Sequence, residues 1–206
     1  MKVIIFGSTG RTGKYLIQSA LEAGYEVLAF ARIPDNIQIK HPRLSVFQGD
    51  VTQPQSIAEA MVGCNAVLSA VGTDLGHTDL REKAMTHIVA AMKTLGISRI
   101  IGIGGMGILQ ANESTKIFET EGFPGQYIPV SKDHLAAYRV LENSGLQYTF
   151  VCPPMIADAP ETGVYQTDAE YPPKGNFQIA AGDLAAFMVS ELEAKKFLGK
   201  RVGISS

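Results

Sequence analysis

Short runs of apolar residues alternate along the chain with longer segments in which apolar residues recur every three to four positions. The short runs predict β-strands, and the longer periodic segments predict helices that bury one face. The predicted strands cover residues 2–6, 26–31, 44–48, 66–71, 99–104 and 148–152, and the predicted helices cover residues 12–23, 54–61, 78–95, 132–144 and 183–196. Strands that alternate with helices are typical of a parallel sheet with crossover helices. The pattern therefore predicts the α/β class, with a single Rossmann-like, doubly wound parallel sheet and helices on both faces.

Two segments carry little periodicity and are rich in Gly, Pro and polar residues; they fall within residues 104–130 and 153–179. In an open α/β sheet, long connections beyond the carboxyl ends of the strands surround the ligand. With 206 residues, of which 46% are hydrophobic, the chain is long enough for one sizeable core. We expect one domain over residues 1–206, with these two segments on its substrate side.

The charge balance argues for a small-molecule ligand. Eighteen basic and 20 acidic residues give a formal net charge of -2, whereas proteins that bind nucleic acid or anionic membranes usually carry a basic surplus. Cys64 and Cys152 lie far apart and match no metal-ligand spacing. Together with the lack of a long apolar run, this composition leads us to expect a cytoplasmic protein with no metal, nucleic-acid or membrane partner.

Three glycines, Gly7, Gly10 and Gly13, stand directly between the first predicted strand and the first predicted helix. Glycine allows a tight turn and a close approach of the backbone to a pyrophosphate, whose charge the free N–H groups of the helix stabilise. Four intervening residues complete the candidate phosphate-binding turn: Ser8, Thr9, Arg11 and Thr12. The same spacing also serves turns that bind no ligand, but its position after the first strand favours a dinucleotide.

The residue at the end of the second predicted strand indicates which dinucleotide the chain binds. An NAD site usually has Asp or Glu there for the ribose 2′-OH, whereas an NADP site has a cation for the 2′-phosphate. This chain has Arg32 at that point, and its first carboxylate beyond it is Asp35. Arg11, in the glycine turn, is a second candidate for the phosphate. NADP(H) is therefore favoured over NAD(H), the alternative being that Arg32 is an ordinary surface residue.

Two later stretches are candidates for the same pocket. Asp50 and Val51 follow the third predicted strand, where a carboxylate can accept a hydrogen bond from the adenine amine. A turn or helix-cap role for Asp50 is equally compatible with the sequence. The small residues Ala70, Val71 and Gly72 end the fourth strand, where backbone can lie against a ribose.

The chain resembles the biliverdin-IXβ reductase and flavin reductase branch of the atypical, NmrA-like short-chain dehydrogenases. The stretches that carry this resemblance are "GSTGRTG", Arg32, "GDV", "AVG", "IVAAMKTLGISRII" and "DHLAAYRVLENSGLQYTFVCPPMIADAPETGVY". The likeness covers nearly the whole chain and is most specific over residues 133–165. It implies a monomer that binds NADPH and passes hydride to a flavin, biliverdin or quinone-like acceptor. It also implies that Arg32 meets the 2′-phosphate and that the nicotinamide end is lined by Pro153, Pro154, Met155 and Ile156.

The chain departs from this family at the substrate side. Gly104 and Gly105 stand where the family commonly has a Thr-Ser pair, and Met155 stands where it has His. Val130 and His134 fall where short-chain dehydrogenases proper have the Tyr and Lys of Tyr-x-x-x-Lys. Alcohol or ketone chemistry by that route is therefore not expected.

These residues lead to a picture of the acceptor pocket. We expect Ser131 to cap a helix whose first turn contains Lys132, Asp133 and His134, with His134 the best candidate for a catalytic side chain. Gly104, Gly105 and Met106 are expected to form the floor of the pocket, and His134, Met155 and Ile156 its walls. Hydride transfer to such an acceptor needs mainly orientation from the protein.

Two other functions stay open. The missing hydroxyl and tyrosine also fit a non-catalytic NADP(H) sensor or interaction module that has lost its catalytic groups. An isomerase or epimerase of the extended short-chain type ranks last, because Val130 cannot replace a tyrosine acid/base.

Overall fold

The computed structural model describes residues 1–72 and 79–206. Its strands are β1 (Lys2–Phe6), β2 (Glu26–Ala31), β3 (Leu44–Gln48), β4 (Ala66–Ser69), β5 (Arg99–Ile103), β6 (Gln147–Cys152), β7 (Met155–Ala157), β8 (Gln166–Ala169), β9 (Gln178–Ala180) and β10 (Lys200–Ser205). Its α-helices are α1 (Arg11–Glu22), α2 (Pro54–Ala60), α3 (Leu80–Leu95), α4 (Ile128–Glu142) and α5 (Ala181–Ala194). The six predicted strands are present with bounds within two residues of those predicted. The predicted start of the third helix at residue 78 lies outside the described residues.

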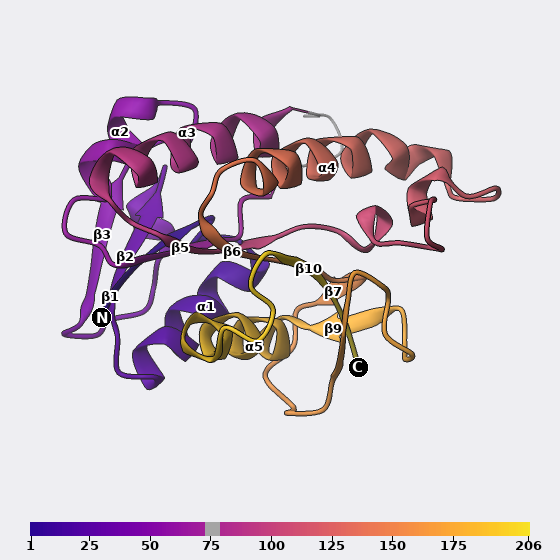
Figure 1. Cartoon of the computed structure of the whole chain (residues 1–206). Coiled ribbons are helices and arrows are strands. Elements are labelled where there is room, and N and C mark those ends of the chain that lie inside the picture. The colour runs from indigo at the N-terminus through magenta and orange to yellow at the C-terminus, as the bar shows by residue number, and fades with distance from the viewer. Residues whose placement is uncertain (73–78) are drawn as a thin grey trace.

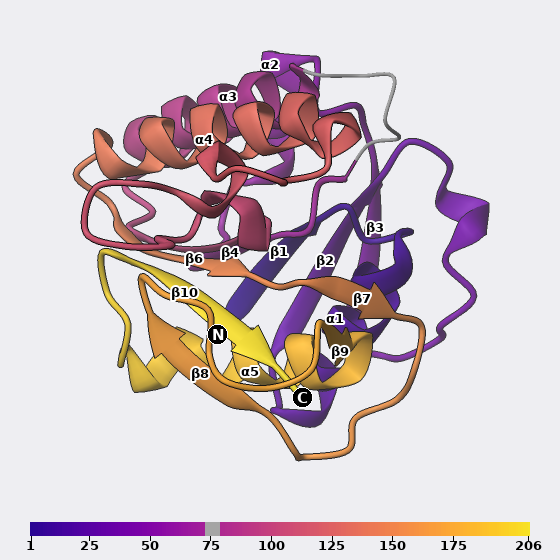
Figure 2. The ribbon, with the colours of Figure 1, turned by 90° about the vertical axis from the view of Figure 1, so that its right-hand side faces the viewer.

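The large sheet has the order β3-β2-β1-β4-β5-β6-β10-β8. In Figure 2, β3 lies on the right of this sheet, and β10 and β8 lie at its lower left. All neighbours are parallel except β8, which pairs antiparallel with β10. Strands β7 and β9 form a separate parallel pair. This arrangement confirms the predicted Rossmann-like α/β fold. The chain runs from β1 outward to β2 and β3 on one side and then returns to β4 on the other side of β1. A crevice is therefore expected at the carboxyl ends of β1 and β4.

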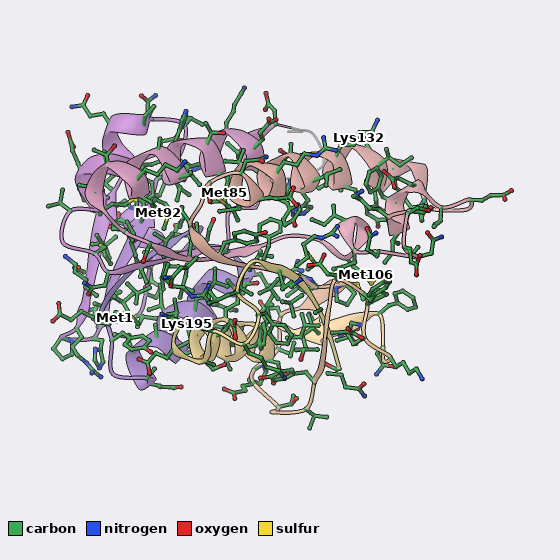
Figure 3. The ribbon with its side chains drawn as sticks, viewed as in Figure 1. Met1, Met85, Met92, Met106, Lys132 and Lys195 are labelled. Carbon is green, nitrogen blue, oxygen red and sulfur yellow. The ribbon has the colours of Figure 1, made fainter. Side chains whose placement is uncertain are left out.

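Helices cover both faces of the sheet (Figure 1). Helices α2, α3 and α4 lie on one face, and helices α1 and α5 lie on the other. Each of these two groups of helices covers a separate apolar cluster. The α3 residues Met85 and Met92, labelled in Figure 3, are buried in the first cluster. The strands of a sheet covered on both faces read as continuous apolar runs, and β1 illustrates this, since Val3 to Phe6 are fully buried.

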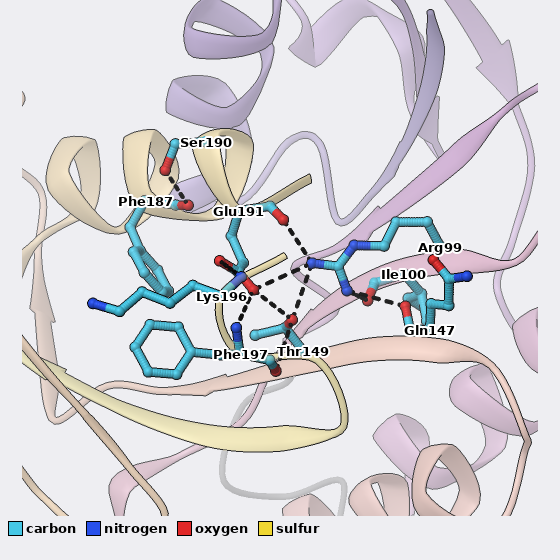
Figure 4. A network of polar contacts seen from close by, with 9 residues as sticks. All are labelled: Arg99, Ile100, Gln147, Thr149, Phe187, Ser190, Glu191, Lys196 and Phe197. Carbon is cyan, nitrogen blue, oxygen red and sulfur yellow. Dashed lines mark hydrogen bonds and ion pairs between the residues drawn. The ribbon is translucent and has the colours of Figure 1, made fainter. Parts of the chain in front are cut away.

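A buried polar network ties the end of α5 to the sheet (Figure 4). The guanidinium of Arg99 donates to the backbone oxygen of Glu191 at 2.7 Å and to the Thr149 hydroxyl at 3.0 Å. The Glu191 carboxylate accepts the backbone N–H groups of Lys196 at 3.1 Å and Phe197 at 2.8 Å. Burial lowers the pKa of Arg99, while Glu191 opposes that effect. The network fixes the turn that leads into β10.

The prediction that Ser131 caps a helix is wrong. Helix α4 begins at Ile128, preceded by Tyr127, and Ser131 lies inside it, only 5% exposed. Proline is tolerated in the first turn of a helix, where its missing N–H has no partner to lose, so Pro129 allows this earlier start. Lys132, Asp133 and His134 consequently lie beyond the first turn.

Within residues 1–72 and 79–206, no helix is both long enough and apolar enough to span a bilayer.

Candidate functional site

A cleft of about 770 Å³ opens at the carboxyl ends of the parallel strands. One end is formed by residues that follow β2 and β3, including Arg32 and Asp50. The middle is formed by the glycine turn after β1 and by residues 70–72 after β4. The other end includes Gly104 after β5, His134 of α4 and Ile156 of β7. The cleft thus crosses the sheet at the point where the strand order reverses.

The glycine turn is built by close backbone approaches. Gly7 has a φ of +75°, and a β-carbon there would lie 2.3 Å from the carbonyl oxygen of Ala70. A β-carbon on Gly13 would lie 2.2 Å from the carbonyl oxygen of Gly7. Neither distance is compatible with a side chain, so the turn requires glycine at both positions for steric reasons within the protein.

The N-terminus of α1 is suited to a phosphate. Its N-cap residue, Gly10, provides no side-chain cap, and the first turn contains no acidic residue. The first N–H groups of a helix have no partner within the helix, and the helix dipole is positive at this end. The residues present therefore fit the pyrophosphate of a dinucleotide.

Most of the residues predicted to bind the cofactor line this cleft. They are Gly7, Thr9, Gly10, Arg11, Thr12, Arg32, Asp50, Val51, Ala70, Val71, Gly72, Gly104 and Ile156, and the predicted catalytic residue His134 joins them. Ser8 and Gly13 support the turn instead of lining the cleft: the Ser8 hydroxyl is buried and donates to the carbonyl oxygen of Phe30 at 2.8 Å.

At the β2 and β3 end of the cleft, Arg32 is exposed, and its positive charge acts on the carboxylate of Asp50. The Asp50 carboxylate accepts hydrogen bonds from the backbone N–H of Thr52 at 2.8 Å and from its hydroxyl at 2.9 Å. The Thr52 N–H and hydroxyl, with the positive charge of Arg32, lower the pKa of Asp50. Asp50 therefore makes a local turn and also contributes a carboxylate to the cleft.

Arg11 connects the glycine turn to β7. Its Nη1 donates to the carbonyl oxygen of Ile156 at 2.5 Å. Next to it, Asp158 pairs with Lys14 at 2.7 Å and accepts the Tyr15 hydroxyl at 3.1 Å. In this structure Arg11 thus reaches the β7 side of the cleft, the opposite end from Arg32.

At the β5 end the backbone of Gly104 and Gly105 lies between β6 and α4. A β-carbon on Gly104 would lie 2.6 Å from the ring of Phe150, and one on Gly105 would lie 3.0 Å from Cδ2 of His134. Gly105 therefore contacts the imidazole and is not among the cleft-lining residues; neither are Pro153, Pro154 and Met155. Of the four residues 153–156 that were expected to line the nicotinamide end, only Ile156 lines the cleft. Met155, which was expected to form part of the wall, is 64% exposed.

His134 is a neutral group in this site. Burial, and to a smaller degree the charge of Arg81, lower its pKa from 6.5 to about 3. Its Nδ1 is buried without a hydrogen-bond partner. At neutral pH the ring therefore offers one N–H donor and one acceptor, and it is a poor source of an acidic proton.

Gly49, part of the predicted "GDV" stretch, also lines the cleft, and six further lining residues were not identified from the sequence: Phe30, Ala31, Thr52, Leu80, Arg81 and Ile103. Phe30, Ala31 and Ile103 stand at the ends of predicted strands, so their position on those strands was the available signal. Arg81 is different, because it comes from the first turn of α3 and is held by Asp133, 52 residues later.

A family model for NAD(P)H-binding proteins matches residues 7–195 of this chain. Among curated proteins, the chain is 26% identical to Uncharacterized protein YwnB of Bacillus subtilis (strain 168), over 100% of this chain and 99% of that protein. It spans 36% of the length of each of the next two curated relatives.

Solved structures with the same fold include a candidate epimerase from Bacteroides thetaiotaomicron, with a TM-score of 0.87 and 26% identity over 99% of this chain and 96% of that one. A candidate NADH-flavin reductase from Streptococcus pneumoniae TIGR4 has a TM-score of 0.85 and 25% identity over 99% of this chain and 98% of that one. Since the family model covers most of the chain, the protein belongs to the NAD(P)H-binding family and has the Rossmann-like fold described above.

Proposed function

We propose that the protein is an NADPH-dependent reductase that transfers hydride to a flavin-like, tetrapyrrole-like or quinone-like acceptor. The observation that carries this proposal is that one continuous cleft runs from Arg32, past the glycine turn, to Gly104 and His134. An extended dinucleotide in this cleft has its phosphates at the glycine turn and its nicotinamide at the β5 end. The acceptor then enters beside His134 and Ile156.

Arg32 is the proposed reader of the adenosine 2′-phosphate. It is exposed at the end of β2, and its guanidinium can make two parallel hydrogen bonds to a phosphate. The S. pneumoniae neighbour is described as a candidate NADH-flavin reductase, and the experiment below compares NADPH with NADH for this chain.

The chemistry of the cleft favours an acceptor that needs no strong acid from the protein. Among the described residues that line it there is no tyrosine and no lysine, and His134 is neutral. When bound, a reduced nicotinamide supplies a hydride, that is two electrons and one hydrogen nucleus, and a proton from water completes the reduction of the acceptor. The residues of the chain hold and orient the two partners and limit water around them.

The test is the anaerobic oxidation of NADPH by FMN, biliverdin and a small quinone in turn, each repeated with NADH. The proposal predicts that at least one acceptor is reduced, with one NADPH consumed per acceptor and a clear preference for NADPH. Turnover with NADH alone would overturn the cofactor assignment. NADPH binding without turnover of any acceptor would identify a dinucleotide sensor instead.

A further inference from the structure

A cation at the acceptor end of the cleft has no role in the function proposed above. Arg81, in the first turn of α3, lines the cleft together with His134 and Gly104. Its side chain is only 10% exposed. Its guanidinium binds Asp133, the residue that precedes His134 in α4, and its charge contributes to the low pKa of His134.

The position of Arg81 is fixed by Asp133 of α4. The Asp133 carboxylate, fully buried, accepts Nη1 of Arg81 at 3.1 Å and the backbone N–H groups of Arg81 at 3.3 Å and Glu82 at 3.1 Å. Asp133 thus stabilises the positive end of α3 as well as the guanidinium. Because one carboxylate serves three donors and the helix dipole, the charge of Arg81 is only partly compensated.

The guanidinium also keeps unused hydrogen-bonding capacity. Its Nε is buried without a partner, as is Nδ1 of the neighbouring His134. A buried polar atom without a partner is costly, and a ligand that completes it is one reason for its presence. Two such atoms on side chains that line the same cleft indicate a polar group of a ligand.

We propose that Arg81 binds an anionic substituent, a carboxylate or a phosphate, carried by the acceptor. This inference rests on the proposed function, which assigns the phosphates of the dinucleotide to the glycine turn and to Arg32. The remaining described residues at this end are apolar or glycine, such as Ile103, Gly104 and Ile156. The cation therefore distinguishes anionic planar acceptors from neutral ones with the same ring system.

Binding of matched acceptor pairs to the NADP⁺-saturated protein tests this inference without requiring turnover. Riboflavin and FMN share one ring and differ in a phosphate, while biliverdin dimethyl ester and biliverdin differ in two carboxylates. The inference predicts that the anionic member of at least one pair binds roughly tenfold to a hundredfold tighter, as expected for a charged hydrogen bond. The pair that shows this preference identifies the anion as a phosphate or a carboxylate.

Arg81→Gln is predicted to abolish the preference while leaving NADP⁺ affinity unchanged. Lys83→Gln is the matched control, since it removes an exposed charge from the same helix and is predicted to keep the preference. If Arg81→Gln does not fold, Arg81→Lys retains the charge and is predicted to keep the preference in weaker form.

Equal affinities within both pairs, or an equal loss for neutral and anionic acceptors in Arg81→Gln, would overturn the inference. A fall in NADP⁺ affinity in Arg81→Gln would do the same, because it would assign Arg81 to the cofactor. A charge preference in binding, without any NADPH oxidation, would uphold the anion site and reject the reductase function.

Discussion

The imidazole of His134 lies directly against the backbone of Gly105. A β-carbon on Gly105 would lie 3.0 Å from Cδ2 and 3.2 Å from Nε2 of the ring. The family that this chain resembles commonly has a hydroxyl-bearing residue at this point. Here the side of the pocket is formed by a ring from α4, and a side chain on residue 105 would require that ring to shift.

Gly105→Leu is expected to displace the His134 ring and to lower kcat/KM for the acceptor by about tenfold, or ~1.4 kcal/mol of transition-state stabilisation. NADPH affinity is expected to stay within about twofold of the wild type, because Gly105 is not among the cleft-lining residues. Steady-state kinetics and an NADPH titration measure both quantities. Gly125→Leu is the control, since a β-carbon there meets no atom within 4 Å. Unchanged acceptor kinetics in Gly105→Leu would disprove this placement of the acceptor.

Arg32→Ala is expected to weaken NADPH binding by roughly tenfold to a hundredfold, the value of one charged hydrogen-bonding group. NADH affinity is expected to change little, since NADH lacks the 2′-phosphate that the guanidinium binds. Isothermal titration of both dinucleotides checks this, with Lys40→Ala as a control for the loss of an exposed cation outside the cleft. An equal loss of affinity for both dinucleotides would contradict the assignment of Arg32.

Gly7→Ala is expected to reduce the free energy of unfolding by more than the ~1–3 kcal/mol of a strained backbone alone, because its β-carbon would also overlap the Ala70 carbonyl. Gly63→Ala separates the two effects. Gly63 has a similar φ of +76°, but a β-carbon there meets nothing within 4 Å. Urea denaturation of both variants gives the comparison. Equal destabilisation would mean that the turn can relax around a side chain at residue 7.

The low pKa of His134 determines the direction in which the free energy of unfolding changes with pH. The folded protein holds the ring neutral down to about pH 3, while the unfolded chain takes up a proton near pH 6.5. The unfolded state therefore binds more protons between these values, and the free energy of unfolding falls as the pH drops from about 6.5 towards 3.

His134→Gln removes this contribution, so its free energy of unfolding is expected to fall less steeply than that of the wild type, by up to ~1.4 kcal/mol per pH unit. Urea denaturation at several pH values in this window measures the two slopes. Parallel slopes for the two proteins would show that His134 titrates normally in the folded state.

The sequence was sufficient for strands β1 to β6 of the large sheet but not for β10 and β8, which complete it beyond β6. Strands buried on both faces, such as β1, read as unbroken apolar runs. Strand β10 was missed because "KRVGIS" begins with two charged residues and contains a glycine. Arg201 is nevertheless buried there, since its Nε donates to the Glu170 carboxylate at 2.8 Å from a segment 31 residues away. Such a partner is set by tertiary structure and leaves no local pattern.

The candidate site likewise has parts that local sequence predicts and parts that depend on tertiary packing. The glycine turn and Arg32 follow from a strand, a turn and a helix that are adjacent in sequence. The contact between Gly105 and His134 depends on how α4 packs against the segment after β5, and the pairing of Arg81 with Asp133 depends on how α3 packs against α4. The helix that presents His134 was also predicted to begin too late, because Pro129 was not recognised as a residue of its first turn.

The most direct test of the proposed reductase function measures NADPH binding and NADPH oxidation on one preparation of the protein. A reductase of this kind is expected to show saturable NADPH binding that is tighter than NADH binding, together with oxidation that requires both the protein and an acceptor such as FMN or biliverdin. Saturable NADPH binding with no oxidation in the presence of flavin, tetrapyrrole or quinone would contradict the proposed reductase.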